Sequence, residues 1–338
     1  MTPTKPVAFW RSLSRWLPGI VISAVALWLV LRSVTWQDVG KALTEINPLT
    51  LVLVIGIYIV AMCLRAMCWR TILQNRVVLL RAFFVMNEGY LLNNLFPLRI
   101  GELGRALILG RSSGLGFFQV LSTIVVERSY DLAIAASLLL GTLPMVLEME
   151  WERSLAWTIL ALVAAGLVGL YALARYRQPF LKWAAKASGR FTFVQQWVLP
   201  KVSAILDGFA VLTRPGAFVI SFVLMAASWL LAIMEEYLIL KEMVPTASFW
   251  WLAFVLVVSA LGAGVPSVAG AIGVYEAAVV GALSLLGVDP AKGLAFALII
   301  HLIQLGMSSL FGIIGLVKEG ESLASLYQSL TAKKSQTA

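Results

Sequence analysis

Three charged residues, Glu127, Arg128 and Asp131, interrupt an apolar run long enough to span a membrane. Each would cost about 2.5 to 3.5 kcal/mol at the centre of a bilayer, so the three must be paired or face water. On a helix, Glu127 and Asp131 share a face and Arg128 reaches Asp131, which leaves one acid for a partner elsewhere. Arg99 or Arg105 would serve as that partner. The pattern fits either a buried structural ion network or a site for a charged ligand.

Both arginines belong to residues 82–111, a segment that is apolar enough to enter a bilayer but unsuited to cross it as one helix. It contains Pro97 together with glycines, asparagines and charges, and basic residues flank it on both sides. We therefore expect a re-entrant segment that enters and leaves on the same side. A broken helix offers free backbone N–H groups and the positive end of its dipole, which favour an anion such as phosphate. The candidate ligands here are Asn94, Arg99, Glu102 and Arg105.

Glu102 lies three residues from each arginine of this segment and can pair with either on a helix. The alternative is that the arginines extend to the membrane interface, as long basic side chains do near helix ends. That alternative gives no role to Glu102 or to the asparagines. The residues therefore favour a binding function for the segment.

A second interruption occupies residues 262–276 and resembles the first in composition. It combines a proline with downstream glycines and a glutamate, and it lies in the middle of the C-terminal half. Paired Gly/Pro breaks in corresponding positions are typical of transporters built from two repeats, with the substrate between the broken helices. The candidate binding residues here are Gly270, Gly273 and Glu276.

His301 is the single histidine, and Gln304 follows three residues later in the last apolar segment. Histidine titrates near neutral pH, so this pair is a candidate proton or polar relay. The alternative is a polar side chain that is hydrogen-bonded between helices. Glu235 and Glu236 lie near the outer end of their expected span, and we expect them at the membrane interface.

Motifs for covalent or metal-dependent chemistry are missing from the sequence. It contains no P-loop, HExxH or CxxC, and Cys63 and Cys68 have neither disulfide-framework nor metal-ligand spacing. We expect no metal, no cofactor and no enzymatic activity. The alternative is a membrane-embedded lipid or glycan transferase, for which the carboxylates named above could supply acid–base chemistry.

The composition identifies a polytopic membrane protein, since 60% of the 338 residues are hydrophobic, 13% are charged and the mean hydropathy is +0.91. A soluble domain has about 25% charged residues. The net charge of +9 would suggest nucleic acid in a soluble protein. Here the basic residues gather in loops, as they do on the cytoplasmic side of membrane proteins, so nucleic acid is excluded as a partner.

The fold class predicted from these patterns is all-α, with about eight membrane segments and two re-entrant or broken-helix hairpins arranged as two pseudo-repeats. The second span is expected to end near Leu64 and lead into a cytoplasmic loop with Arg65, Arg70, Arg76 and Arg81. Basic flanking residues place both termini in the cytoplasm. The expected divisions are 1–48 for the first helix and outer loop, 49–174 for the first repeat, 175–215 for a basic connector, 216–317 for the second repeat and 318–338 for the tail.

Within the connector, basic residues recur every four positions at Lys182, Lys186 and Arg190, beside aromatic residues. This pattern is typical of a helix that lies on an anionic lipid surface. A plain tether between the two halves is the alternative.

Three motifs together resemble the flippase-like family that includes the transmembrane region of lysylphosphatidylglycerol synthases. They are Asn94-x-x-Pro97-x-Arg99-x-Gly101-Glu102-x-x-Arg105, Glu127-Arg128-x-x-Asp131 and Pro266-x-x-x-Gly270-x-x-Gly273-x-x-Glu276. The resemblance implies a bacterial inner-membrane protein that moves a lipid across the bilayer. Synthase members continue into a soluble aminoacyl-transfer domain that this sequence lacks, so lysyltransferase activity is not implied.

The function expected from residues and resemblance together is a flippase for an anionic or aminoacylated phospholipid, or for another phosphate-bearing lipid. Its expected partners are that lipid and a lipid-modifying enzyme. Besides the transferase named above, a second alternative to the flippase is an accessory subunit of a lipid-modifying enzyme.

Overall fold

The computed structural model describes residues 21–32, 34–96, 100–145, 151–189, 191–264 and 267–319, and within these ranges all regular structure is helical. The prediction of an all-α polytopic membrane protein is confirmed. A short helix covers Val21–Arg32. The N-terminal α-helices are α2 (Trp36–Thr44), α3 (Pro48–Ile72), α4 (Leu79–Leu95), α5 (Gly101–Ser112), α6 (Phe117–Thr142) and α7 (Trp151–Arg175). The later ones are α8 (Arg177–Ala187), α9 (Leu199–Gly208), α10 (Pro215–Met243), α11 (Phe249–Ala263), α12 (Val274–Leu285) and α13 (Pro290–Glu319).

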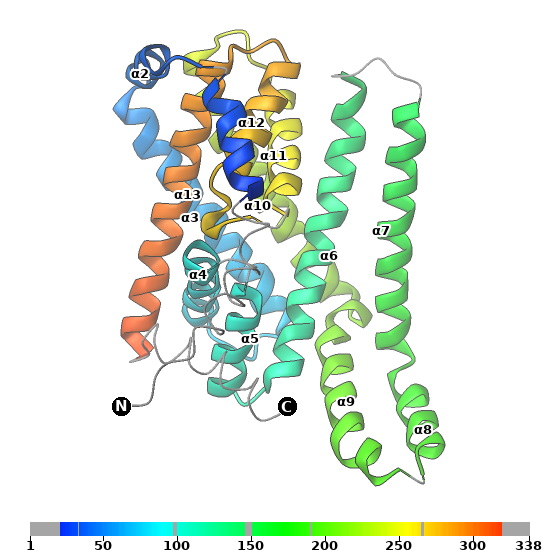
Figure 1. Cartoon of the computed structure of the whole chain (residues 1–338). Helices are drawn as coiled ribbons and strands as arrows, with labels where there is room; N and C mark the ends of the chain where they lie inside the picture. The colour runs from blue at the N-terminus through cyan, green and yellow to red at the C-terminus, as the bar shows by residue number, and fades with distance from the viewer. Residues whose placement is uncertain are drawn as a thin grey trace, which may run out of the picture. The chain divides into compact units, whose positions relative to one another are not determined.

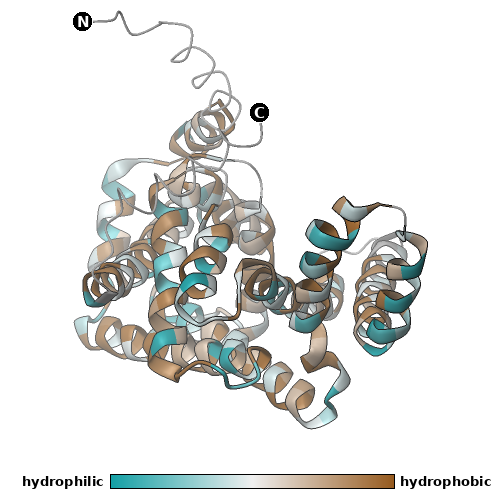
Figure 2. Ribbon diagram, turned by 90° about the horizontal axis from the view of Figure 1, so that it is seen from below, coloured by the Kyte–Doolittle hydropathy of each residue, from teal (hydrophilic) through white to brown (hydrophobic). Residues whose placement is uncertain are grey.

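Four helical stretches of the described chain are long and apolar enough to cross a membrane, namely α3, the part of α7 from Trp157 to Arg175, α10 and α13. The ribbon in Figure 2 is accordingly coloured brown, for hydrophobic residues, over much of its length. α6 has 26 residues, or about 39 Å at 1.5 Å per residue, but carries the three charges in its middle. The expected total of about eight segments stays a prediction.

Prolines begin three of the long helices, at Pro48, Pro215 and Pro290. Proline suits the first helical position because its missing N–H would have no partner there and its φ is already helical. The side chain of Asp289 then caps α13, accepting from the N–H groups of Ala291 at 2.9 Å and Lys292 at 3.3 Å. These local signals fix where the helices start.

The chain divides into two compact units that each draw on three segments. Unit 1 takes its residues from within Met1–Gly56, Leu91–Ile100 and Ile233–Met307, and unit 2 from within Ile57–Tyr90, Gly101–Ala232 and Ser308–Ala338. Helices α3, α4, α10 and α13 contribute residues to both units. The predicted division into repeats at 49–174 and 216–317, and their relation as pseudo-repeats, stay predictions.

In unit 2, α6 packs against α5, α7 and α9, and α6 and α7 form a long antiparallel hairpin (Figure 1). Tyr130 of α6 bonds to Ser221 of α10 at 3.2 Å and makes edge-to-face contacts with Phe218 and Phe222. On the α9 side, a Cβ at Gly208 would overlap the Ser122 side chain. α6 is therefore held on several faces, which fixes the direction of its charged side chains.

The interruption around Pro97 joins two antiparallel helices, α4 and α5. Arg81 near the start of α4 donates to Ser112 at the end of α5, at 2.9 Å, and Gly89 in the middle of α4 lies against Arg105. Residues 97–99, including Arg99, lie outside the described residues. The break predicted in this segment is confirmed, and its re-entrant course in a membrane stays a prediction.

The second interruption, in unit 1, separates α11 from α12, which pack against each other. The two helices are close enough that a Cβ at Gly262 would lie 2.7 Å from the Cβ of Ala278. Between them, Gly270 and Gly273 adopt φ of +68° and +84°, a left-handed conformation that glycine adopts without strain. Pro266 lies outside the described residues.

The basic connector folds into α8, a π-helical turn at Val194–Val198, α9 and a 3₁₀ turn at Phe209–Thr213. Arg177 pairs with Asp207 at 2.6 Å and so ties α8 to α9. Trp183 and Phe191 are exposed, as expected for a lipid-facing segment, while Arg190 lies outside the described residues. Neither the lipid-surface interpretation nor the plain tether is tested by these contacts.

Candidate functional site

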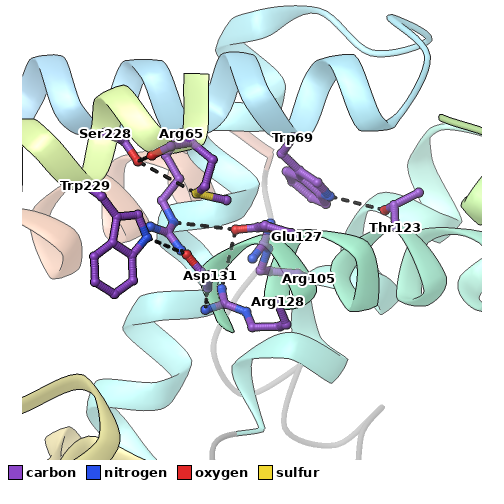
Figure 3. Close-up of polar contacts among 10 residues, drawn as sticks. Arg65, Trp69, Arg105, Thr123, Glu127, Arg128, Asp131, Ser228 and Trp229 are labelled. Carbon is purple, nitrogen blue, oxygen red and sulfur yellow. Dashed lines mark hydrogen bonds and ion pairs between the residues drawn. The ribbon is translucent and has the colours of Figure 1, made fainter. Parts of the chain in front are cut away.

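The three charges of α6 lie at the centre of an ion network in unit 2 (Figure 3). Arg128 pairs with Asp131 at 2.9 Å, as the helical spacing predicts, and also with Glu127 at 3.4 Å. The side chain of Glu127 is fully buried, that of Asp131 is 14% exposed and that of Arg128 is 37% exposed. The network therefore has a buried end at Glu127 and a more open end at Arg128.

Arg105 of α5 supplies the partner that the sequence predicted for the remaining acid. Its Nη2 lies 2.7 Å from Oε2 of Glu127. The guanidinium also stacks 4.0 Å over the ring of Trp69, which in turn donates to Thr123 of α6 at 3.2 Å. Gly89 makes room for the arginine, because a Cβ there would overlap its methylene groups.

Arg65 is a member of the network that sequence reasoning missed. Nη2 of Arg65 donates to both carboxylate oxygens of Asp131, at 2.5 Å to Oδ1, and Nε of Arg65 lies 3.6 Å from Oε1 of Glu127. The expectation that Arg65 and Arg70 belong to a loop is wrong, because α3 continues to Ile72. The available signal was the apolar pattern around Cys68 and Trp69, which extends beyond the first arginine.

Trp229 of α10 completes the surroundings of Asp131, donating from Nε1 to Oδ1 at 3.0 Å. Oδ1 of Asp131 thus accepts from Arg65 and Trp229, and Oδ2 accepts from Arg65 and Arg128. Such charge-assisted bonds are stronger than neutral ones. The carboxylate is held in one orientation by helices α3, α6 and α10.

The network carries more positive than negative charge. Three guanidiniums face two carboxylates, a net charge of +1. Guanidinium N–H groups also remain without a hydrogen-bond partner in the described part of the chain, at Nε of Arg65 and Arg128 and at Nε and Nη1 of Arg105. Buried donors are normally satisfied, so an acceptor such as water or a ligand oxygen is expected beside these groups. A phosphate would match both the surplus charge and the planar donors.

Glu102, Asn94 and Arg99 are the other residues predicted for this site. Glu102 is half-buried in the first turn of α5, and the described ion pair of Arg105 is with Glu127 rather than with Glu102. Asn94 belongs to unit 1, where its Nδ2 lies 3.5 Å from the carbonyl of Leu305. Arg99 lies outside the described residues.

Unit 1 contains a second polar cluster, formed by four other predicted residues. His301 of α13 lies 2.6 Å from Oε1 of Glu276 through Nδ1 and 2.9 Å from the carbonyl oxygen of Gly270 through Nε2. The other oxygen of Glu276 accepts from the N–H of Gly273 at 2.6 Å, which caps α12. His301 is thus bonded to the second broken hairpin, and the relay role predicted for Gln304 stays a prediction.

Glu235 and Glu236 are both buried in α10, at 2% and 1% exposure. Their expected position at the membrane interface stays a prediction. α10 continues to Met243, so the pair lies two turns inside the helix end. Oxygens of both carboxyls and the hydroxyl of Tyr275 have no hydrogen-bond partner among the described residues.

Comparison with protein families decides the identity of the chain. A family model described as the lysylphosphatidylglycerol synthase TM region matches residues 16–312. The chain belongs to this family. The match covers both interrupted segments and the charged triplet, so the resemblance drawn from the three motifs is confirmed. No curated protein and no solved structure matches the chain.

Membership of the lysylphosphatidylglycerol synthase TM family indicates a lipid-related function in a membrane. The described residues contain no group of three or more His, Cys, Asp and Glu side chains that could hold a metal ion.

Proposed function

We propose that this protein is a lipid translocase that moves an anionic or aminoacylated phospholipid, or another phosphate-bearing lipid, across the bilayer. The observation that carries the proposal is the net positive network of Arg65, Arg105 and Arg128 with Glu127 and Asp131. Charges inside apolar helices are costly and tend to mark a substrate path. An excess of arginine with unpaired N–H groups suits the phosphate that phospholipids share.

The roles of the side chains follow from their exposure. Arg128 is the most open of the three arginines and is the proposed first contact for the phosphate. Arg65 and Arg105 are almost enclosed and are held by Asp131 and Glu127, so they set the local field. Arg99 and Glu102 remain proposed binding residues on the basis of the sequence, and the acyl chains would stay in lipid.

The wider setting is part of the same proposal. We place the protein in the inner membrane of a bacterium with both termini in the cytoplasm, working as a transporter rather than as an enzyme. A lipid-modifying enzyme that supplies or consumes the lipid is the proposed partner. The basic connector, with its exposed aromatic residues, would lie on the anionic cytoplasmic surface.

The test is reconstitution of the full chain in liposomes that contain trace fluorescent lipids. Transbilayer movement is measured for phosphatidylglycerol, for lysylphosphatidylglycerol and for glucosylceramide, which has no phosphate. We expect the protein to accelerate movement of the phosphate-bearing lipids, and Arg128→Gln to reduce it at least about tenfold, the effect of one charge-assisted bond. Arg111→Gln, which removes an exposed arginine from the last turn of α5, is the matched control.

Equal rates with and without protein for every lipid would refute the proposal. The transferase alternative predicts a new lipid product on incubation with a donor. The accessory-subunit alternative predicts tight co-purification with an enzyme and tolerance of Arg128→Gln. These outcomes separate the three functions.

A further inference from the structure

The cluster of His301, Glu276 and Gly270 in unit 1 can be read as a proton-binding site from its hydrogen bonds alone. Nε2 of His301 faces a carbonyl oxygen, which only accepts, so this nitrogen must carry a proton. Nδ1 faces a carboxyl oxygen at 2.6 Å, so a second proton must lie between them. Histidine and glutamate together therefore hold two exchangeable protons and a net charge of zero.

Loss of one of these protons would break one of the two contacts of His301. A neutral imidazole has one N–H, and Nδ1–H would remain with the Glu276 carboxylate as the stronger acceptor. Nε2 would then turn a lone pair toward the carbonyl oxygen of Gly270, which is repulsive. The proton thus links α13 to the loop between α11 and α12.

Residues 267–273, the described part of the loop between α11 and α12, are held by individual side-chain contacts. Gly270 and Gly273 both have positive φ, and the N–H of Gly273 is held by the other oxygen of Glu276. The N–H of Val268 is held by Ser23 at 3.1 Å. The regular structure within residues 267–273 is a short 3₁₀ turn at Ala269–Ala271, and Gly273 lies against Ser23 and Leu27 of the short N-terminal helix. The contact between His301 and Gly270 adds a hydrogen bond that ties these residues to α13.

The groups near the cluster are a phenol and buried carboxyls. The ring of Tyr275 packs at a tilt of 39° against His301, with ring centroids 4.4 Å apart, and Glu235 and Glu236 are buried in α10 of the same unit. Burying an unpaired charge is costly, so Glu235 and Glu236 are expected to be neutral acids that hold protons of their own. The ion pair of Glu276 among the described residues is with His301.

We propose that the Glu276–His301 pair is a proton-operated latch that couples lipid movement to proton exchange. Bound proton keeps the loop between α11 and α12 tied to α13. Release of one proton to water takes the pair from neutral to a net charge of −1 and frees the loop. The proposal rests on the proposed translocase function, and it adds the proton gradient as an energy source.

The latch is tested first without transport, by hydrogen–deuterium exchange of the full chain in nanodiscs. With exchange rates corrected for the intrinsic effect of pH, protection of residues 267–273 should fall about fivefold, the effect of one hydrogen bond, between about pH 5.5 and about pH 8.5. Glu276→Gln should keep the loop protected at both pH values. Its amide can donate to Nδ1 and still accept from Gly273, so it mimics the protonated pair.

Two further variants serve as controls for the exchange experiment. Glu45→Gln removes a half-exposed carboxylate in the same unit that pairs with Lys292 at 3.6 Å, and it should behave as wild type. His301→Gln should leave the loop unprotected at both pH values. If protection in the wild type does not change with pH, or if Glu276→Gln changes with pH as the wild type does, the latch is wrong.

Coupling is tested in liposomes with an imposed pH difference. We expect the wild type to move phosphatidylglycerol about fivefold faster with the gradient in one direction than without it, and Glu276→Gln to respond to neither direction. Movement that ignores the gradient in the wild type would overturn the coupling and leave the translocase function standing. No protein-dependent movement under any condition would refute the translocase function, and this inference with it.

Discussion

Glu127→Gln should destabilise the protein strongly, because the carboxylate is fully buried among three arginines. Arg105, Arg128 and Arg65 lie 2.7, 3.4 and 3.6 Å from its oxygens. The substitution keeps the shape of the side chain but raises the charge of the network from +1 to +2, since three guanidiniums then face Asp131 alone. Removing one partner from a buried ion pair costs about 3 to 5 kcal/mol, and that is the loss of unfolding free energy we expect.

The measurement is unfolding in detergent, followed by circular dichroism at 222 nm over an SDS titration. Glu45→Gln is the matched control, because it removes the same charge from a half-exposed pair and should cost less than about 1 kcal/mol. Arg105→Gln in the Glu127→Gln background returns the network to +1. The double variant should therefore lose less stability than the two single variants added together, with a coupling of about 0.5 to 3 kcal/mol. Equal losses for Glu127→Gln and Glu45→Gln, or strict additivity, would refute the account of the network.

Three further substitutions test individual contacts by the same unfolding measurement, and Gly141→Ala is the control for the first of them. Gly89→Ala places a methyl group against Arg105, which is pinned by Glu127 and Trp69, and should cost about 1 to 3 kcal/mol. The control Gly141→Ala places its methyl group in open space beside α6 and should stabilise the protein by about 0.5 to 1 kcal/mol. Equal effects of Gly89→Ala and Gly141→Ala would argue against the close fit between Gly89 and Arg105. Trp229→Phe removes the donor to Asp131 and should cost about 1.5 to 3 kcal/mol; no change would mean that the indole bond is not formed. Asp207→Asn breaks a one-third-exposed pair with Arg177 and should cost less than about 1 kcal/mol, whereas a larger loss would give the connector a structural role.

The sequence was sufficient to predict the fold class and the central pairing of the network. Helical spacing predicted the contact between Arg128 and Asp131, and the cost of a lone buried acid predicted a partner for Glu127 from the segment that contains Arg105. The breaks near Pro97 and between Gly262 and Glu276 followed from proline and glycine, whose backbone effects are local. These predictions needed no knowledge of tertiary structure.

The sequence could not predict the contacts that depend on which helices pack against each other. Arg65 was placed in a loop because a basic residue after an apolar run resembles the end of a span, whereas its partner Asp131 lies 66 positions away. The burial of Glu235 and Glu236 could not be predicted either, because it depends on how α10 packs against other helices. The contact of His301 with Gly270 also required the loop conformation, which spacing along α13 cannot reveal.

The most direct test of the central claim is the rate of transbilayer movement of fluorescent phosphatidylglycerol in liposomes that contain equal amounts of folded wild type or Arg128→Gln. The account predicts rapid, protein-dependent movement for the wild type and a loss of at least about tenfold for the variant, because the most open arginine of a net positive network would be gone. Wild-type liposomes that move the lipid no faster than protein-free liposomes would contradict the claim. So would an Arg128→Gln rate equal to that of the wild type.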